Sequence, residues 1–465
     1  MISFCSDSLR RSELGTFKVK GFEINLHGLK KTLGSGRNEQ SHQHSFSGSS
    51  VESFNSFVRA PQELQKINEI GKGCCGNVVK AVHIPTMRLV AIKQISVFER
   101  DRRHQMVKEL AVLAKHTDVK ELISMQGAFY DEGCVSLILE YMNRQSLQEF
   151  VNAGVVISEH MLQHIALQAV RGLHEMHSRR YIHRDIKPGN ILINHRGDVK
   201  LADFGVLAPL ENMAFATTFV GTVMFMSPER VEGKYTFAAD IWGLGMSLYV
   251  LATLLPPFDA KDGYFGIVRK IKENDPPRLP CVTDASLPVS TRAFSPALCD
   301  FVSACLVKDA DRRPTAEALL THPFLTNADI AWNSSPAQQA ASLAPFAAVT
   351  SAQEQDLLSV LQVFLHHHYL QPAQQYRRSL FELSTLQRIA EEVGVPPQHV
   401  QAAFEHLYVQ TLSSLSHSQI EPGPQQPSED VDYETLEPFH EESTFVEVCD
   451  AEETLCAPSR SREQF

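Results

Sequence analysis

The sequence has few cysteines, and none of them stand at C-x-x-C spacing. The nine cysteines among 465 residues are odd in number, which argues against a disulfide framework and against a structural zinc site. The residues after Met1 also lack the apolar core of a secretory signal peptide. We therefore expect a reducing compartment, the cytoplasm and also the nucleus.

Long hydrophobic runs are absent as well. The stretch that comes nearest, 241–255, has 15 residues and stops at Pro256 and Pro257, whereas a membrane-spanning helix needs about 20 apolar residues. We expect a buried helix there and no membrane insertion.

Excess positive charge is missing too. The chain carries 43 Lys and Arg against 54 Asp and Glu, a net charge of −11. The stretch 421–465 holds 13 acidic residues against Arg460 and Arg462, which is also −11, so the rest of the chain is neutral. A chain whose main part is neutral lacks the excess of basic residues that binds a phosphate backbone, which argues against nucleic acid as a partner. Residues 413–465 are predicted to be an acidic disordered tail.

Composition divides the remainder of the chain. Residues 1–62 are rich in Ser, Gly, His and Lys, and we expect a mostly disordered N-terminal arm. Residues 326–352 are rich in Ala, Ser and Gln with two prolines, and are predicted to be a linker. Residues 353–412 have helical apolar spacing, which indicates a small helical module.

One pattern within the arm is a candidate docking motif. Lys18 and Lys20 precede the spaced apolar pair Ile24 and Leu26. Such a segment suits an acidic groove on a partner protein.

Between the arm and the linker, the apolar period changes from two to helical. Residues 64–98 predict three antiparallel strands, and 158–325 are mainly helical. A small β-rich lobe therefore precedes a larger α-rich lobe, which is an α+β fold.

A glycine-rich loop joins the first two predicted strands. Gly71, Gly73 and Gly76 lie ahead of Val78, and glycines let backbone N–H groups approach phosphates closely. A plain hairpin turn would have the same composition, so the loop indicates a nucleotide site only in combination with the motifs downstream of it.

The third predicted strand carries Ala91 and Lys93 on one face. A small side chain there admits a flat base, while the lysine reaches phosphates. Glu109, on the helix after this strand, is predicted to pair with Lys93 because an inward carboxylate needs a cation.

Two further motifs carry most of the chemistry. His183-Arg184-Asp185-Ile186-Lys187-Pro188-Gly189-Asn190 is followed by Asp203-Phe204-Gly205. Phosphoryl transfer needs metal ligands, a carboxylate for the attacking hydroxyl and cations for the phosphate charge. Asn190 and Asp203 supply the first for Mg²⁺, Asp185 the second, and Lys187 with Lys93 the third.

With these motifs in this order, residues 64–325 resemble the eukaryotic protein kinases. Ser227-Pro228-Glu229 matches the end of the family's activation segment, Asp240 opens the central buried helix, and Arg313 is the partner expected for Glu229. The resemblance implies a bilobal kinase fold and the cofactors ATP and Mg²⁺. It also implies that Leu139 is the gatekeeper beside the adenine, followed by the hinge residues Glu140, Tyr141 and Met142.

Within the kinases, the stretches 219–222 and 226–230 resemble the MAP kinase kinases. The stretches 81–85, 97–100 and 210–212 look most like the plant-type member with a nuclear transport factor-like extension, although only about 356–381 could match that extension. The resemblance implies phosphorylation of Thr and Tyr in the T-x-Y loop of a downstream MAP kinase, and activation by an upstream MAP kinase kinase kinase. Thr222 would belong to the substrate platform.

The chain departs from this family in its activation loop. Thr218 occupies the second phosphorylation site, but Ala214 and Asn212 stand where the first hydroxyl is expected, and Thr217 is a substitute. A Ser/Thr kinase of another branch and a scaffold with a kinase fold therefore stay open as alternatives.

Overall fold

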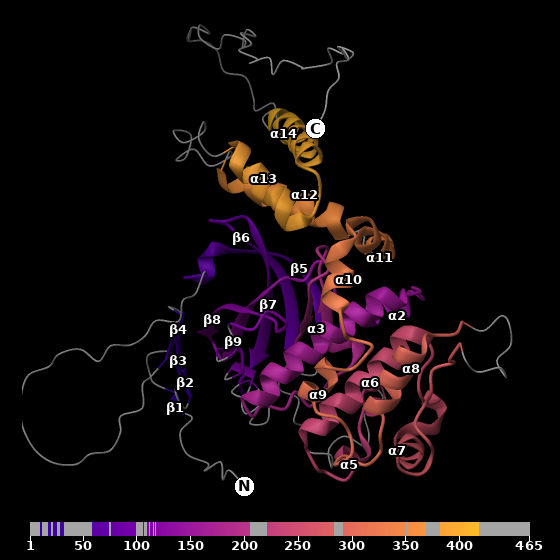
Figure 1. Cartoon of the computed structure of the whole chain (residues 1–465). Coiled ribbons are helices and arrows are strands. Elements are labelled where there is room, and N and C mark those ends of the chain that lie inside the picture. Colours follow the sequence, from indigo (N-terminus) through magenta and orange to yellow (C-terminus); the bar gives the residue numbers. More distant parts are fainter. Residues whose placement is uncertain are drawn as a thin grey trace, which may run out of the picture. The chain divides into compact units, whose positions relative to one another are not determined.

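The computed structural model describes most of the chain between residues 58 and 417, together with short strands before it (Figure 1). The described residues are 10–11, 17–19, 22–25, 28–31, 58–73, 76–98, 106, 109–110, 112–114, 116, 118–204, 221–282, 292–349, 352–368 and 382–417. The acidic tail lies outside them, apart from the end of the last helix.

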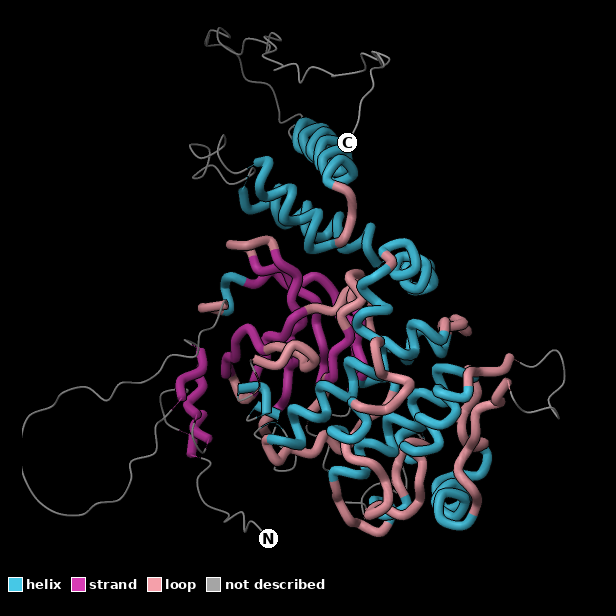
Figure 2. The backbone as a smooth tube through the Cα atoms, in the orientation of Figure 1, coloured by secondary structure: helices cyan, strands magenta, loops and turns pink. Residues whose placement is uncertain are grey.

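An antiparallel sheet of five strands forms the smaller lobe (Figure 2). The strands are β5 (Leu64–Gly73), β6 (Gly76–His83), β7 (Arg88–Ser96), β8 (Met125–Asp131) and β9 (Cys134–Glu140), in the spatial order β5-β6-β7-β9-β8. The first three are the strands predicted from the period of two. The described residues 106, 109–110 and 112–114 are helical, and Leu110 and Leu113 are buried in the core.

The larger lobe is built around α6 (Phe237–Thr253), whose residues are nearly all buried. This confirms the buried helix expected from the 15-residue apolar stretch. Around it lie α2 (Leu147–Asn152), α3 (Glu159–Ser178), α5 (Pro228–Val231), α7 (Gly263–Glu273), α8 (Pro296–Cys305) and α9 (Ala316–Leu320). The hairpin of β10 (Ile191–Ile193) and β11 (Val199–Leu201) comes after the 3₁₀ turn η2 (Pro188–Asn190). Short 3₁₀ turns η1 (Pro61–Glu63) and η4 (Ala260–Asp262) complete the described elements of the two lobes. The predicted bilobal α+β fold is confirmed.

The stretch predicted to be a linker is helical. It forms α10 (Ala328–Ser334) and α11 (Pro336–Val349), and both contact α3. Trp332 stacks on His164 with ring centroids 3.8 Å apart, and Phe346 contacts Phe150 with centroids 4.4 Å apart. These two aromatic side chains join the main core, so this segment belongs to the larger lobe.

Four short strands lie in the arm that is predicted to be mostly disordered. They are β1 (Arg10–Arg11), β2 (Phe17–Val19), β3 (Phe22–Asn25) and β4 (Gly28–Lys31), paired in that order. Ile24 of the candidate docking motif is fully buried in the main core, and β3 and β4 contact β8. In this conformation Ile24 is covered by the chain itself and is not available to a docking groove. Lys20 and Leu26 lie outside the described residues.

The C-terminal module has three helices, α12 (Ala352–His368), α13 (Glu382–Val393) and α14 (Pro397–His417). Their apolar side chains pack on Val82, Met87 and Leu89 of the β6–β7 hairpin. The module residues in this cluster are Leu357, Val360, Leu361, Val363, Phe364, Ile389, Ala390, Val393 and Val400. Among the described helices, none is both long and apolar enough to cross a membrane.

Candidate active site

Lys93 lies at the centre of a charge cluster in which Lys93 and Glu109 are buried and Asp203 is half-exposed. It is on β7, where it pairs with Val78 of β6 on one side and Leu137 of β9 on the other. Its Nζ is 2.7 Å from Oε1 of Glu109 and also contacts Oδ1 of Asp203. The predicted pairing of Lys93 with Glu109 is therefore present, and the Asp203 carboxylate joins it.

These contacts set the charges of the three groups. Burial alone would lower the pKa of Lys93, but the carboxylates of Asp203 and Glu109 outweigh it and raise that pKa. The Lys93 ammonium lowers the pKa of Asp203. Burial raises the pKa of Glu109, which Lys93 only partly offsets. Lys93 therefore stays positively charged at neutral pH, which its predicted role as a phosphate ligand requires.

The loop before β10 brings the other predicted catalytic residues together. Lys187 Nζ is 2.9 Å from Oδ2 of Asp185 and donates to Oγ1 of Thr222 at 3.1 Å. The Asn190 side-chain amide donates to the Asp185 carbonyl at 2.7 Å and to its Oδ2 at 2.8 Å. Asp185 is thus held in one orientation, and Thr222 lies beside it as the resemblance implied.

A buried aspartate supports this loop from the centre of the larger lobe. Asp240 accepts the backbone N–H groups of His183 and Arg184 at 2.8 and 2.7 Å, and His177 at 2.9 Å. Burial alone would raise the pKa of Asp240, but these donors hold it below its ordinary value. The sequence predicts Asp240 only as the start of a helix, because its partners lie 56 to 63 positions away.

The glycine loop joins β5 and β6, and its tip requires a glycine at one position. Gly76 has φ +145°, and a Cβ there would lie 1.8 Å from the carbonyl oxygen of Gln94. Gly71 and Gly73 are in β5, and Val78 is partly buried on β6. The cysteines at the tip, Cys74 and Cys75, lie outside the described residues.

The predicted adenine pocket has its residues on neighbouring strands. Ala91 of β7 pairs with Leu139 of β9, and both are buried. Glu140 ends β9, and its Oε1 accepts the Ser124 N–H at 2.9 Å and lies 2.7 Å from Lys200 Nζ. Met142 is buried just after it. Leu139 thus lies near the end of β9, directly before Glu140, Tyr141 and Met142, and the gatekeeper and hinge roles of these residues stay predictions.

The oxygen donors fit a magnesium ion. The Asn190 amide nitrogen is used by Asp185, which leaves its Oδ1 for a cation, and Asp203 adds a half-exposed carboxylate. One carboxylate and one amide oxygen, completed by phosphate oxygens and water, is an ordinary set for Mg²⁺.

Two further predictions concern the activation segment. Arg313 forms a two-pronged ion pair with Glu229, at 2.7 Å from Nη1 to Oε1 and 3.1 Å from Nη2 to Oε2, as expected. Thr217 and Thr218 lie outside the described residues, so both stay predictions. The rings of His183 and Phe204 are in contact, with centroids 5.3 Å apart.

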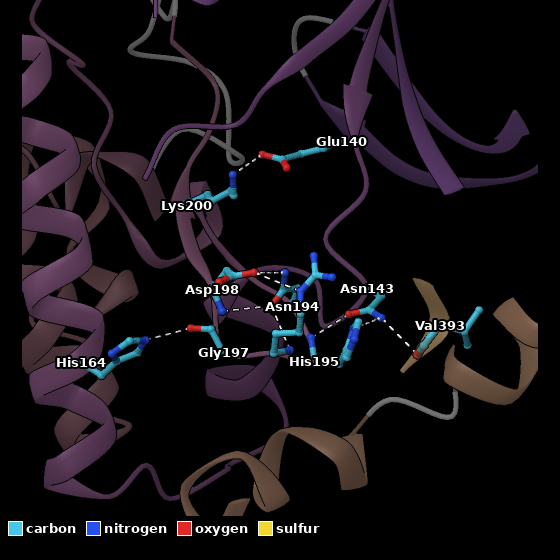
Figure 3. Close-up of polar contacts among 10 residues, drawn as sticks. Glu140, Asn143, His164, Asn194, His195, Gly197, Asp198, Lys200 and Val393 are labelled. Carbon is cyan, nitrogen blue, oxygen red and sulfur yellow. Dashed lines mark hydrogen bonds and ion pairs between the residues drawn. The ribbon is translucent and has the colours of Figure 1, made fainter. Parts of the chain in front are cut away.

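Contacts behind the hinge had no signal in the sequence (Figure 3). Asn143 Nδ2 donates to the carbonyl of Val393 in α13 at 3.3 Å and lies 2.8 Å from Nδ1 of His195, and Asn143 Oδ1 accepts the His195 backbone N–H at 2.9 Å. A residue adjacent to the hinge thus joins the larger lobe to the C-terminal module. The partner is 250 positions away, which no local pattern could reveal.

Comparison with known proteins agrees with this geometry. A family model described as protein kinase domain matches residues 64–325, more than half of the chain. Mitogen-activated protein kinase kinase 3 of Arabidopsis thaliana is 38% identical over 331 residues, which cover 69% of this chain and 60% of that relative. The matched region therefore spans about three fifths of that relative's length.

Of two further relatives, one is named a mitogen-activated protein kinase kinase and the other a serine/threonine-protein kinase. Mitogen-activated protein kinase kinase 2 of Arabidopsis thaliana is 37% identical over 57% of this chain and 73% of its own length. Serine/threonine-protein kinase dst1 of Dictyostelium discoideum is 38% identical over 57% of this chain and 35% of its own length. The chain belongs to the protein kinases and, within them, to the MAP kinase kinase family. The nuclear transport factor-like extension stays a prediction.

Proposed function

We propose that this chain is a dual-specificity protein kinase that uses Mg·ATP to phosphorylate the Thr and Tyr of the T-x-Y loop of a MAP kinase. The observation that carries the proposal is the cluster in which Asp185, Lys187 and Thr222 face one another across two segments of the larger lobe. The names of its plant relatives support the choice of a MAP kinase as substrate.

The proposed roles rest on the geometry. Asp185, fixed by Asn190, orients the attacking hydroxyl and accepts its proton. Lys93 and Lys187 are the cations that face the phosphate charge. Asn190 and Asp203 would hold Mg²⁺, which when bound neutralises charge on the phosphate oxygens. Thr222, hydrogen-bonded to Lys187, positions the substrate segment.

We also propose that an upstream MAP kinase kinase kinase activates the chain at Thr218, with Thr217 as the second hydroxyl. Arg184 supports this, because its guanidinium lies 5.3 Å from the centre of the Tyr235 ring and its buried Nε has no hydrogen bond among the described residues. A phosphate on the loop would supply the acceptor that Arg184 lacks.

The test incubates the purified chain with Mg·ATP and a catalytically dead MAP kinase, and maps phosphorylated residues on both proteins by mass spectrometry. Phosphate on both Thr and Tyr of the substrate loop is the expected result. Phosphate on one hydroxyl type only would favour a Ser/Thr kinase of another branch.

If the purified chain is inactive, the assay is repeated with Thr218→Glu and with chain that has been pretreated with an upstream kinase. Rescue would show that the activator was missing. Continued absence of transfer in both would contradict the proposal and favour the scaffold alternative.

A further inference from the structure

A buried ion pair joins the smaller lobe to the C-terminal module. Lys80 of β6 and Asp356 of α12 approach to 2.5 Å between Nζ and Oδ1. Their side chains are only 6% and 0% exposed. A buried pair of this kind costs a large desolvation energy, so its place in the fold calls for an explanation.

The hinge residue Tyr141 is the third member of this cluster. The Lys80 ammonium lies 5.9 Å from the centre of the Tyr141 ring. Burial and the neighbouring Asp356 carboxylate together raise the pKa of the Tyr141 phenol. Asp356 Oδ2 is buried and has no hydrogen bond of normal geometry among the described residues, and the Tyr141 hydroxyl is a group that interacts with this carboxylate. The carboxylate therefore faces the hinge as well as the sheet.

Lys80 also belongs to the roof of the predicted nucleotide site, which is the sheet face that carries Ala91 and Lys93. Directly paired residues of neighbouring strands project on the same face of a sheet. Val78 pairs with Lys93 and Lys80 pairs with Ala91. Asp356 thus binds the residue adjacent to the small side chain that is expected to cover the adenine.

The module holds both sides of the hinge at once. Glu392 of α13 accepts the backbone N–H of Leu89 in β7 at 3.2 Å. Asn143, just after the hinge, binds the Val393 carbonyl and His195 of the larger lobe (Figure 3). Roof, hinge and larger lobe all contact one helical module.

We propose that Asp356 is a positioning residue for the nucleotide site, which holds hinge Tyr141 and roof Lys80 in one cluster so that the C-terminal module fixes the adenine pocket. The inference rests on the proposed function, because it assigns ATP to that pocket. It extends the site beyond the kinase domain at 64–325. A purely structural role for the pair would stabilise the fold without changing nucleotide affinity.

The experiment uses the full chain with Lys80→Met and Asp356→Leu combined. This double variant removes both buried charges together, so it leaves no unpaired ion and keeps the fold more readily than Asp356→Asn. A second variant, Tyr141→Phe, removes only the hinge hydroxyl. The matched control is Asp329→Asn, which breaks the ion pair of α10 with Arg171 of α3 away from the hinge.

Four quantities are measured for each protein: the melting temperature, the Kd for a fluorescent ATP analogue, the KM for ATP and kcat. We expect the double variant to raise Kd and KM about tenfold, the effect of losing one interaction with a charged group. Its kcat should change less than about twofold, because binding is lost equally in ground and transition states. Tyr141→Phe should shift Kd in the same direction, and Asp329→Asn should leave it unchanged.

A folded double variant with the wild-type Kd and KM would overturn the inference and leave the proposed function intact. An equal shift in Asp329→Asn would also overturn it, since the effect would not be specific to the hinge. A wild-type chain that neither binds the analogue nor transfers phosphate would overturn the proposed function, and the inference with it.

Discussion

At the scale of residues, the charge on Lys93 is maintained by two carboxylates. We predict that Lys93→Met lowers kcat at least about 100-fold, because one electrostatic contact to the reacting phosphate is lost. The matched control is Lys270→Met in α7, since Lys270 also pairs with a carboxylate, Asp262, away from the site. Turnover is measured with Mg·ATP and a MAP kinase substrate. Retained activity in Lys93→Met would contradict the site assignment, provided that circular dichroism shows a folded chain.

A second prediction at this scale concerns stability and pH. Burial lowers the pKa of His164 to about 4, while Nε2 lies 2.9 Å from the Gly197 carbonyl (Figure 3). The ring is neutral in the folded chain but takes up a proton near pH 6.5 when unfolded. The free energy of unfolding should therefore fall as the pH drops below 6.5, by about 2 kcal/mol between pH 6.5 and 5 from this residue alone.

The check compares urea unfolding of the wild type and His164→Phe at pH 7 and pH 5. Phenylalanine keeps a ring to stack on Trp332 but cannot titrate. We expect the variant to lose less stability between the two pH values than the wild type. Equal losses would show that His164 does not titrate on unfolding.

At the scale of elements, Trp332 is the large buried side chain through which α10 packs on the larger lobe. Trp332 is buried against His160 and His164 of α3, with ring centroids 5.3 and 3.8 Å away. We predict that Trp332→Ala lowers the free energy of unfolding by about 3–5 kcal/mol, as large core truncations do. Ile330→Ala in the same helix, at a side chain that is 67% exposed, should change it by about 0.5 kcal/mol or less. Similar effects of the two variants would contradict the packing of α10.

The same helix shows why the local sequence predicts a linker there. α10 has seven residues, and the Ala, Ser and Gln around it carry little apolar periodicity. The helix is stabilised because Trp332 packs against two histidines more than 160 positions earlier in the chain. A local sequence pattern cannot predict such a contact. The strands β3 and β4 are a similar case, because they are short and are stabilised where Ile24 enters the main core.

The active site is more predictable than these elements. Asp185, Lys187 and Asn190 lie within six positions and form contacts set by one short loop. Lys93 and Glu109 are paired correctly because a buried carboxylate needs a cation. The supports from Asp240 and Asp356 were not predicted, since the partner of each lies in an element distant along the chain.

At the scale of the whole molecule, the charge is unevenly distributed. The 13 acidic residues and two arginines of 421–465 give −11, and the rest sums to zero. We predict that removing 421–465 leaves kcat and KM for a short peptide substrate unchanged within about twofold, because this stretch has too few apolar residues to pack a core. A steady-state assay on the full and shortened chains checks this, and a large loss of activity would contradict it.

The packing of the C-terminal module on the β6–β7 hairpin has a practical consequence for preparing the protein. A recombinant fragment that ends at residue 325, where the kinase motifs end, would uncover Val82, Met87 and Leu89 and leave the Lys80 ammonium without its carboxylate. We expect such a fragment to aggregate during expression and purification, because a contiguous exposed apolar patch promotes association. A fragment that runs to residue 412 keeps that surface covered, and is the shorter form to choose for crystallisation or inhibitor screening.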